Sequence, residues 1–208
     1  YLYLTKGEGI LNFPAAEVGG FFCSNPSLDR PDLQMHFTRI SGDRDIDNNS
    51  TLDDLPGVTS IAYLTRPESR GSVKITSNDC AEPPLIDANY LATGNDRIAL
   101  IAGVKRLRDI FASAPLATVI GQELRPGVAV ESDEDILAYI KKHGTTAFHP
   151  VGTCKMGNDE QAVVDDRLRV HGVSNLRVVD ASIMPTLISG NTNAATIMIA
   201  EKGADLIL

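Results

Sequence analysis

The sequence predicts an α+β fold in which an antiparallel sheet is backed by helices. Short apolar runs, some with a two-residue alternation, precede residue 80, and an apolar pattern with a helical period follows over residues 98–111. A third observation is that no Gly-x-Gly-x-x-Gly run follows any expected strand. Helices are therefore expected to follow and cover the sheet, and no dinucleotide-binding half is expected within these residues.

The expected strands come first along the chain. Residues 17–22 hold two glycines between apolar side chains, which fits a strand that passes close to another backbone or a ligand. Residues 33–37 alternate apolar and polar side chains, as a half-buried strand does. Residues 41–56 are too polar to bury and are expected as a surface excursion. Residues 59–64 and 71–77 are β-rich runs, which we expect to pair with each other across a long connection.

Three helices are expected. Apolar residues recur about every 3.6 positions over residues 94–114, so this helix covers one face of the sheet. A second helix begins at Ser132, where Asp135 stands three residues on as in a capping box, and ends at Gly144. The last helix is expected over residues 194–208.

The last third of the chain has a different pattern. Residues 163–165 and 168–170 flank a turn at His171 and Gly172, and residues 175–180 indicate a strand that ends in an acid. A polar loop and the last helix follow. A strand end followed by a helix N-terminus is an arrangement that holds a phosphate-bearing cofactor, because unpaired N–H groups and the helix dipole favour negative charge there.

Composition narrows the class of protein. The chain has 208 residues, is 43% hydrophobic and carries a formal charge of −8, which disfavours nucleic-acid binding. No apolar run reaches the roughly 20 residues of a membrane span. The three cysteines lack Cys-x-x-Cys spacing, so neither a metal site nor a disulfide framework is expected. We expect a cytoplasmic protein, with membrane association through redox partners as the alternative. Because the chain starts at Tyr1 without a leader, we expect a piece of a longer chain.

Two motifs in the tail carry the chemistry. Residues 148–157 read Phe-His-Pro-Val-Gly-Thr-Cys-Lys-Met-Gly, and residues 189–193 read Ser-Gly-Asn-Thr-Asn. They place the imidazole of His149 and the amide of Asn191 at two breaks in the chain. A site that oxidises an alcohol needs a base to take the hydroxyl proton, and imidazole has a suitable ordinary pKa.

The tail resembles the C-terminal region of glucose-methanol-choline (GMC) oxidoreductases, and within them the choline-dehydrogenase-like branch. The segments that carry the resemblance in the tail are 148–157, 163–165, 169–173, 176–185 and 190–202. Upstream segments extend it over nearly the whole chain, namely 17–21, 31–37, 66–71 and 132–134.

The resemblance implies a flavoenzyme that binds FAD and oxidises a primary alcohol to an aldehyde by proton removal and hydride transfer. Residues 1–147 would form the substrate-binding domain. Residues 148–208 would carry the active-site loop and return to complete an α/β FAD-binding domain. The N-terminal half with the dinucleotide fingerprint is absent from these residues, so FAD binding requires that half, from the same precursor or a second chain. The small-molecule alcohol is the other partner.

The resemblance also implies roles for single residues. His149 matches the family's active-site base, and Asn191 matches a second position that is His in some members and Asn in others. The candidates for cofactor binding lie at the expected strand end and helix start, and are Asp180, Ala181, Thr192, Asn193 and Ala194. His36 and Glu17 are candidates for substrate contact, Glu17 by offering a carboxylate to a cationic alcohol.

Structural roles compete with these assignments. Asn193 is expected to cap the last helix, Glu17 to lie at the surface, His143 to interact with carbonyls at a helix end, and His171 to occupy a turn. Two other functions also remain open. One is a flavin-bearing hydroxynitrile lyase, which alcohol-dependent bleaching of the flavin would separate from an oxidoreductase. The other is a non-catalytic binding module without the cofactor half, which the sequence preceding Tyr1 would reveal.

Overall fold

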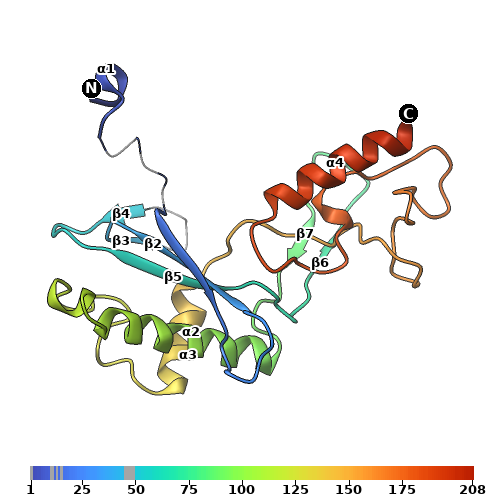
Figure 1. The fold of residues 1–208 in the computed structure, drawn as a ribbon. Helices are drawn as coiled ribbons and strands as arrows, with labels where there is room; N and C mark the ends of the chain where they lie inside the picture. Colours follow the sequence, from blue (N-terminus) through green and yellow to red (C-terminus); the bar gives the residue numbers. More distant parts are fainter. Residues whose placement is uncertain (1, 10–11, 13, 15, 45–49) are drawn as a thin grey trace. The chain divides into compact units, whose positions relative to one another are not determined.

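The computed structural model describes residues 2–9, 12, 14, 16–44 and 50–208, and its chain divides into two compact units (Figure 1). The first unit consists of Tyr1–Leu64 and Arg97–Thr145, and the second of Thr65–Asp96 and Thr146–Leu208. Residues 65–96, which the resemblance assigns to a substrate-binding domain over residues 1–147, therefore group with the tail. A short helix, α1 (Leu2–Lys6), begins the first unit.

A three-stranded antiparallel sheet forms the centre of the first unit. Its strands β1 (Val18–Phe22), β2 (Leu33–Thr38) and β5 (Thr59–Leu64) stand in the order β1-β2-β5. The register places Met35 of β2 opposite Gly20 of β1 and Ala62 of β5. The expected strands over residues 17–22, 33–37 and 59–64 are thus confirmed as part of an antiparallel sheet.

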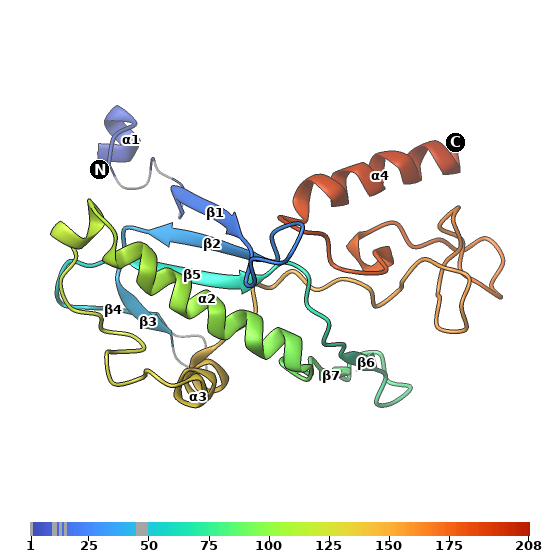
Figure 2. The ribbon, with the colours of Figure 1, turned by 60° about the horizontal axis from the view of Figure 1, so that its bottom comes forward.

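Helix α2 (Gly94–Ala112) lies along one face of this sheet (Figure 2). The approach is close, because a Cβ at Gly103 would stand 3.2 Å from the Cβ of Ala62 and 3.6 Å from the Leu33 side chain. Leu33 is fully buried beneath the helix. At the far end the rings of Phe37 and Phe111 lie 6.0 Å apart. This confirms a helix that covers one sheet face, as the 3.6-residue period predicts.

The other face of the sheet, called here the second face, carries the residues that alternate with those beneath α2. They are Gly19 and Phe21 of β1, Gln34 and His36 of β2, and Ile61 and Tyr63 of β5. Phe21 is 49% exposed and Ile61 is 48% exposed. The sheet therefore has one face packed against a helix and one accessible face within its own unit.

The polar excursion differs from its expected form. It contains two short paired strands, β3 (Gly42–Arg44) and β4 (Ser50–Leu52), and residues 45–49 lie outside the described residues. Asp53, just after β4, accepts hydrogen bonds from Ser41 and Arg125. Because these partners satisfy the carboxylate, the excursion is tied to the loop that precedes the next helix.

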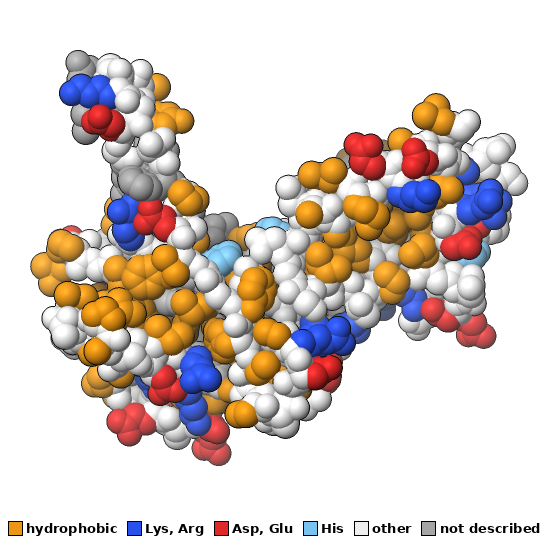
Figure 3. Space-filling model, in the orientation of Figure 1, with side chains coloured by type: hydrophobic (Ala, Val, Ile, Leu, Met, Phe, Trp, Pro, Cys, Tyr) orange, Lys and Arg blue, Asp and Glu red, His pale blue; other side chains and the backbone are white. Residues whose placement is uncertain are grey.

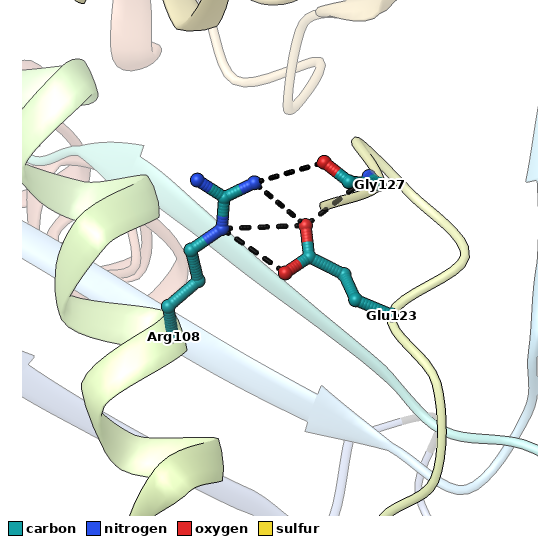
Figure 4. Close-up of polar contacts among 3 residues, drawn as sticks. All are labelled: Arg108, Glu123 and Gly127. Carbon is teal, nitrogen blue, oxygen red and sulfur yellow. Dashed lines mark hydrogen bonds and ion pairs between the residues drawn. The ribbon is translucent and has the colours of Figure 1, made fainter. Parts of the chain in front are cut away.

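The loop after α2 begins with a 3-10 turn, η2 (Leu116–Thr118), and is attached to α2 by an ion pair (Figure 4). Arg108 donates from Nη2 to Oε1 of Glu123 at 2.8 Å and from Nε to Oε2 at 3.0 Å. The same carboxylate accepts the N–H of Gly127 at 3.1 Å. A two-pronged guanidinium contact of this kind fixes orientation as well as distance.

Helix α3 (Asp133–His143) has the ends that its sequence predicts. The Ser132 side chain accepts from the N–H of Asp135 at 3.1 Å, and its hydroxyl donates to the Asp135 carboxylate at 2.6 Å. Gly144 follows the last turn and donates its N–H to the carbonyl of Ile140. Its backbone is extended rather than left-handed, so the glycine ends the helix without the usual left-handed cap. His143 stacks on the ring of Tyr139 at 4.6 Å.

The second unit corrects two expectations about strands. Strand β6 (Ser72–Lys74) pairs with β7 (Leu85–Asp87), so the segment 71–77 does not pair with 59–64. The expected tail strand over residues 175–180 is also wrong, because residues 156–177 form only isolated bridges, such as Val164 with Val170. These bridges are held by turns, and a continuous ladder does not form in this part of the described chain.

A compact core holds the tail together. Five buried residues form it: Val164, Leu168, Ile183, Met184 and Ile199. The last of these lies on α4 (Asn193–Ile207), and Gly203 of the same helix comes close to Val179. Ile197 and Met198 on α4 are 54% and 57% exposed, and hydrophobic side chains gather over and beside α4 (Figure 3). Within the ranges described, no helix is both long and apolar enough to cross a membrane.

Candidate functional site

His149 lies in the loop that follows α3, and a neighbouring carbonyl orients its ring. Phe148 has a positive φ of 59°, and its N–H bonds to the Thr146 hydroxyl at 3.0 Å. This tight turn brings Nδ1 of His149 within hydrogen-bond distance of the Ala147 carbonyl oxygen. Because a carbonyl oxygen only accepts, Nδ1 carries a proton, and Nε2 is the ring nitrogen that can accept another one. His149 is exposed, so a proton donor can reach this ring.

The rest of the first motif is joined to the segment around Asp180 by backbone hydrogen bonds. Cys154 donates to the carbonyl of Ser182 at 3.0 Å, and Met156 donates to that of Ile183 at 2.8 Å. Gly152 has a φ of 88° and lies so near the Met184 carbonyl that a Cβ would stand 3.3 Å from its oxygen. The structure thus brings together two sequence segments that we expected to serve one site.

Asp180 and Ala181 form the start of a 3-10 turn, η3 (Ala181–Ile183). The Asp180 carboxylate accepts the N–H of Ser182 at 2.7 Å and so caps this turn. Asp180 is exposed and Ala181 is half-buried. The cap gives Asp180 a structural role in addition to the cofactor contact that the family resemblance implies.

The second motif leads directly into α4. Thr192 is its N-cap residue, and Asn193 is the first helical residue, so the expectation that Asn193 caps the helix is wrong. The Thr192 side chain forms no capping hydrogen bond, while its carbonyl accepts from Thr196 at 2.9 Å. The first-turn N–H groups, which include that of Ala194, therefore lack the usual side-chain acceptor at the N-cap and face an anion-favouring field.

Both motifs rest on the same core. Val151, two residues after His149, and Ala195, four residues after Asn191, pack against the buried cluster of the second unit. Asn191 itself is exposed. His149 and Asn191 are 42 positions apart in the sequence, but the loops that carry them are both anchored on the same hydrophobic core.

A buried carboxylate holds the segment 66–70 against the start of α2. Asp96 is 3% exposed and accepts the N–H groups of Glu68 and Ser69, each at 2.8 Å. The Ser69 hydroxyl also bonds to this carboxylate and accepts the N–H of Thr93 at 3.2 Å. Burial raises the pKa of Asp96, but the hydrogen bonds from Ser69 and Glu68 outweigh burial and lower it overall. The carboxylate is therefore charged at neutral pH.

The segment 66–70 also forms one side of a pocket of about 230 Å³ in the second unit. Its other side comes from Thr186 and Leu187, which precede the Asn191 loop. The lining includes Arg66, Arg70 and Glu68, a mixture of charges. Arg70 donates to the backbone carbonyls of Pro67 and Ser69, which keeps the segment compact.

The two substrate-contact candidates lie in the first unit. His36 stands on the second face, where its Nε2 is 3.0 Å from Nε2 of Gln34 and its ring meets that of Tyr63 edge-on at 5.1 Å. Burial raises the pKa of Tyr63 to about 12, so this phenol is neutral. Glu17 forms an ion pair with Arg39, with Nε 2.6 Å from Oε2.

The sequence analysis missed three features of these sites: the carbonyl beside His149, the ion pair of Glu17 and the buried carboxylate of Asp96. The Ala147 carbonyl that sets the His149 tautomer is a backbone group and leaves no side-chain signal. The Glu17–Arg39 pair joins residues 22 positions apart, which no local pattern reveals. Asp96 was detectable, because Thr93-x-x-Asp96 has capping-box spacing. Among the residues that the structure describes, no group of three His, Cys, Asp or Glu side chains could hold a metal ion.

Comparison with known proteins gives consistent results. The family model for GMC oxidoreductase matches residues 67–200. The chain is 44% identical over its whole length to an alcohol dehydrogenase [acceptor] from Pseudomonas putida and covers 37% of that protein. It is 43% identical, over 99% of its length, to an oxygen-dependent choline dehydrogenase from Proteus mirabilis and covers 36% of it. The chain thus spans little more than a third of these relatives.

Solved structures agree with the sequence matches. Pyridoxine 4-oxidase from Mesorbium loti superposes with a TM-score of 0.82 at 31% identity, over 92% of this chain and 37% of that one. A formate oxidase from Aspergillus oryzae, from work on FAD modification, superposes with a TM-score of 0.77 at 27% identity, over 86% of this chain and 32% of that one.

Proposed function

Because this chain belongs to the GMC oxidoreductase family, we propose that it is part of an FAD-dependent enzyme that oxidises a primary alcohol to an aldehyde. The observation that carries the proposal is the Nδ1 contact of His149 with the Ala147 carbonyl, which leaves Nε2 as a proton acceptor. The names of the relatives, an alcohol dehydrogenase and a choline dehydrogenase, support a hydroxyl substrate.

The proposed chemistry assigns a separate task to each group. Nε2 of His149 accepts the proton of the substrate hydroxyl, while the Ala147 carbonyl stabilises the imidazolium that forms by accepting from Nδ1. The amide of Asn191 donates a hydrogen bond to the same substrate oxygen. When bound, oxidised FAD supplies the acceptor for the hydride that leaves the substrate carbon. Proton and hydride loss together convert the alcohol to the carbonyl product.

The residues proposed to hold FAD are those around the start of α4 and the η3 turn: Asp180, Ala181, Thr192, Asn193 and Ala194. Their fit to an electron-rich ring rests on the first turn of α4, where the side chain of the N-cap residue Thr192 makes no capping hydrogen bond. A 15-residue helix directs a partial positive charge to that end, which suits a group that gains negative charge on reduction.

We further propose that the active enzyme contains more chain than the residues here. The chain covers 36% to 37% of the two relatives, and the dinucleotide fingerprint is absent from its sequence. In this proposal, residues 1–147 bind the alcohol and residues 148–208 join an N-terminal FAD-binding half. The exposed Ile197 and Met198 of α4 support such a contact, because a helix that is apolar on both sides favours burial on both sides.

The test uses the complete polypeptide with His149→Ala. Anaerobic mixing with alcohol in a stopped-flow instrument measures the rate at which flavin absorbance bleaches. Loss of a general base predicts a rate that is about 10²- to 10⁴-fold lower at unchanged flavin content. His143→Ala is the matched control, because this imidazole stacks on Tyr139 in the first unit and has no assigned role in proton transfer.

Two results would contradict the proposal. Rapid bleaching in the His149→Ala enzyme would rule out this residue as the base. Wild-type enzyme that binds flavin but is not bleached by any alcohol would argue for a reaction without net oxidation, such as cyanohydrin cleavage.

A further inference from the structure

The chain on the two sides of His149 is held in different ways. After His149, Val151 packs against the buried cluster of the second unit. Pro150 also restricts the backbone of His149, because a residue before proline avoids the helical region. Before His149, Ala147 and Phe148 are both exposed, so burial contributes little there. Local hydrogen bonds therefore carry more weight on this side of His149.

Thr146 makes one of these hydrogen bonds. Its Oγ1 accepts the N–H of Phe148 at 3.0 Å, in a local turn that serine and threonine hydroxyls are known to form. Phe148 has a φ of 59°, in the left-handed region that residues with a Cβ disfavour. The steric cost of that conformation and the net gain from one hydrogen bond are of the same order. The Thr146 hydroxyl is thus able to decide whether the turn is populated.

The turn at Phe148 controls the surroundings of the His149 ring. The Ala147 carbonyl is attached to the nitrogen of Phe148, so rotation about the φ bond of Phe148 moves this carbonyl relative to the next residue. With φ at 59°, the carbonyl oxygen lies within hydrogen-bond distance of Nδ1 of His149. In an extended chain, carbonyls point sideways and side chains point to the two faces, so this contact would be lost. The Thr146 hydroxyl therefore acts on His149 through two backbone groups.

The carbonyl contact decides which nitrogen of the His149 ring can receive a proton. A neutral imidazole carries its proton on one nitrogen and accepts at the other. The Ala147 carbonyl only accepts, so it keeps the proton on Nδ1 and the acceptor at Nε2. A ring released from this carbonyl exchanges between the two tautomers, and the Nε2–H form cannot take a substrate proton at Nε2.

We propose that Thr146 is a positioning residue for the proposed alcohol oxidation. Its hydroxyl holds the left-handed turn at Phe148, and that turn keeps the Ala147 carbonyl on Nδ1 of His149, so that Nε2 remains the proton acceptor. This inference rests on the proposed role of His149 as the base. Thr146 itself is assigned no contact with substrate or flavin.

The first test measures the tautomer of His149 in the complete flavin-loaded enzyme labelled with ¹⁵N-histidine. The imidazole ¹⁵N shifts distinguish a protonated nitrogen from an acceptor, and comparison with His149→Ala identifies the His149 signals. At alkaline pH, where imidazole rings are neutral, the wild-type ring should be in the Nδ1–H form. Thr146→Val keeps the branched shape but removes the oxygen, so the Nε2–H form should become detectable. This measurement needs no substrate.

The second test measures flavin bleaching by alcohol under anaerobic conditions. The limiting rate at saturating alcohol should fall about threefold to tenfold in Thr146→Val, which is the population change expected for loss of one hydrogen bond. The Kd of the alcohol should stay within about twofold, because Thr146 does not bind it. Thr146→Ser keeps the hydroxyl and should keep the wild-type rate. Thr145→Val makes the same chemical change at the exposed neighbouring residue and should also keep it.

A double-mutant cycle tests whether the hydroxyl works through the turn. Glycine adopts a positive φ without the steric cost, so the turn in Phe148→Gly no longer needs the hydroxyl. Adding Thr146→Val to Phe148→Gly should therefore change the limiting rate by less than about twofold. An equal loss in both backgrounds would place the effect of Thr146 elsewhere and overturn the inference.

Two other results would also overturn it. One is a Thr146→Val enzyme with normal flavin content in which His149 keeps the Nδ1–H tautomer alone. The other is a Thr146→Ser enzyme that is as slow as Thr146→Val. A changed tautomer with an unchanged bleaching rate would instead argue against His149 as the base, and so against the proposed function. If no alcohol bleaches the wild-type flavin, the proposed function has failed, and the tautomer measurement still decides whether Thr146 positions His149.

Discussion

Replacing Asp96 with asparagine tests how the chain holds residues 66–70 in place. The Asp96 carboxylate is 3% exposed and accepts N–H groups from Glu68 and Ser69, each at 2.8 Å. Asparagine has the same shape but only one oxygen acceptor. Its NH₂ group would point at one of the two N–H donors or at the Ser69 hydroxyl. At least one charge-assisted hydrogen bond is therefore lost.

The size of the effect follows from that count. A hydrogen bond to a charged group contributes about 1.5–3 kcal/mol, so Asp96→Asn should lower the free energy of unfolding by about this amount. The matched control is Asp135→Asn. Asp135 occupies the same third position of a capped helix and bonds to Ser132, but it is exposed. Its replacement should cost no more than about 0.5 kcal/mol.

Urea unfolding of the complete polypeptide gives the global change, and hydrogen exchange of the peptide covering residues 66–71 gives the local one. In the Asp96 variant the amides of Glu68 and Ser69 should exchange faster, by about tenfold for each 1.4 kcal/mol. Equal losses of stability in the two variants, or unchanged exchange at these amides, would refute the anchoring role.

The Asp96 carboxylate should also make the free energy of unfolding depend on pH. Its pKa is lowered in the folded state, because hydrogen bonds from Ser69 and Glu68 overcome the burial that raises it. A lowered pKa stabilises the fold above the unfolded value of about 3.9, and this contribution disappears as the pH falls through the folded value. The difference between wild type and Asp96→Asn should therefore be constant at neutral pH and shrink below about pH 4.

Two further predictions test the tail. An added methyl at Gly203 would stand 2.2 Å from Cγ1 of Val179. Gly203→Ala should therefore lower the free energy of unfolding by roughly 1–3 kcal/mol through overpacking, offset by about 1 kcal/mol of helix propensity. The control is Gly94→Ala, which has nothing within 4 Å and should not destabilise; equal melting temperatures for the two variants would contradict the Val179 contact. The pKa of Asp165 is lowered to about 2, chiefly by a hydrogen bond from Arg169, so Arg169→Gln should raise it towards 3.9 in a carboxyl ¹³C NMR titration. Because the shift is downward, the stabilisation is present above about pH 4 and lost towards pH 2, and an unmoved titration would disprove the assigned cause.

The helices followed from the sequence more faithfully than the sheet pairings. Helix α2 was expected over residues 94–114 and ends at Ala112, and α3 has the Ser132 cap that its spacing predicts. Strand pairing was different: residues 59–64 pair with β2, and residues 72–74 pair with 85–87. A strand's own pattern indicates which side is buried but not which neighbour it joins.

In the candidate site, too, local motifs were predictable from the sequence and contacts between distant groups were not. His149 and Asn191 stand out in sequence because their motifs are long, and their assignment as base and hydrogen-bond donor stays a prediction. The structure adds the Ala147 carbonyl that selects the His149 tautomer and the core beneath Val151 that supports the loop. Neither contact leaves a signal in residue type or spacing.

The sequence by itself determined the family, the antiparallel character of the first unit, the start of α2 and both ends of α3, because periodicity and caps act between residues a few positions apart. Only the tertiary structure decided that residues 65–96 group with the tail and that Arg39 neutralises Glu17. These outcomes depend on contacts between distant residues. Their free energies are set by burial, charge and geometry in the folded chain, which local patterns do not encode.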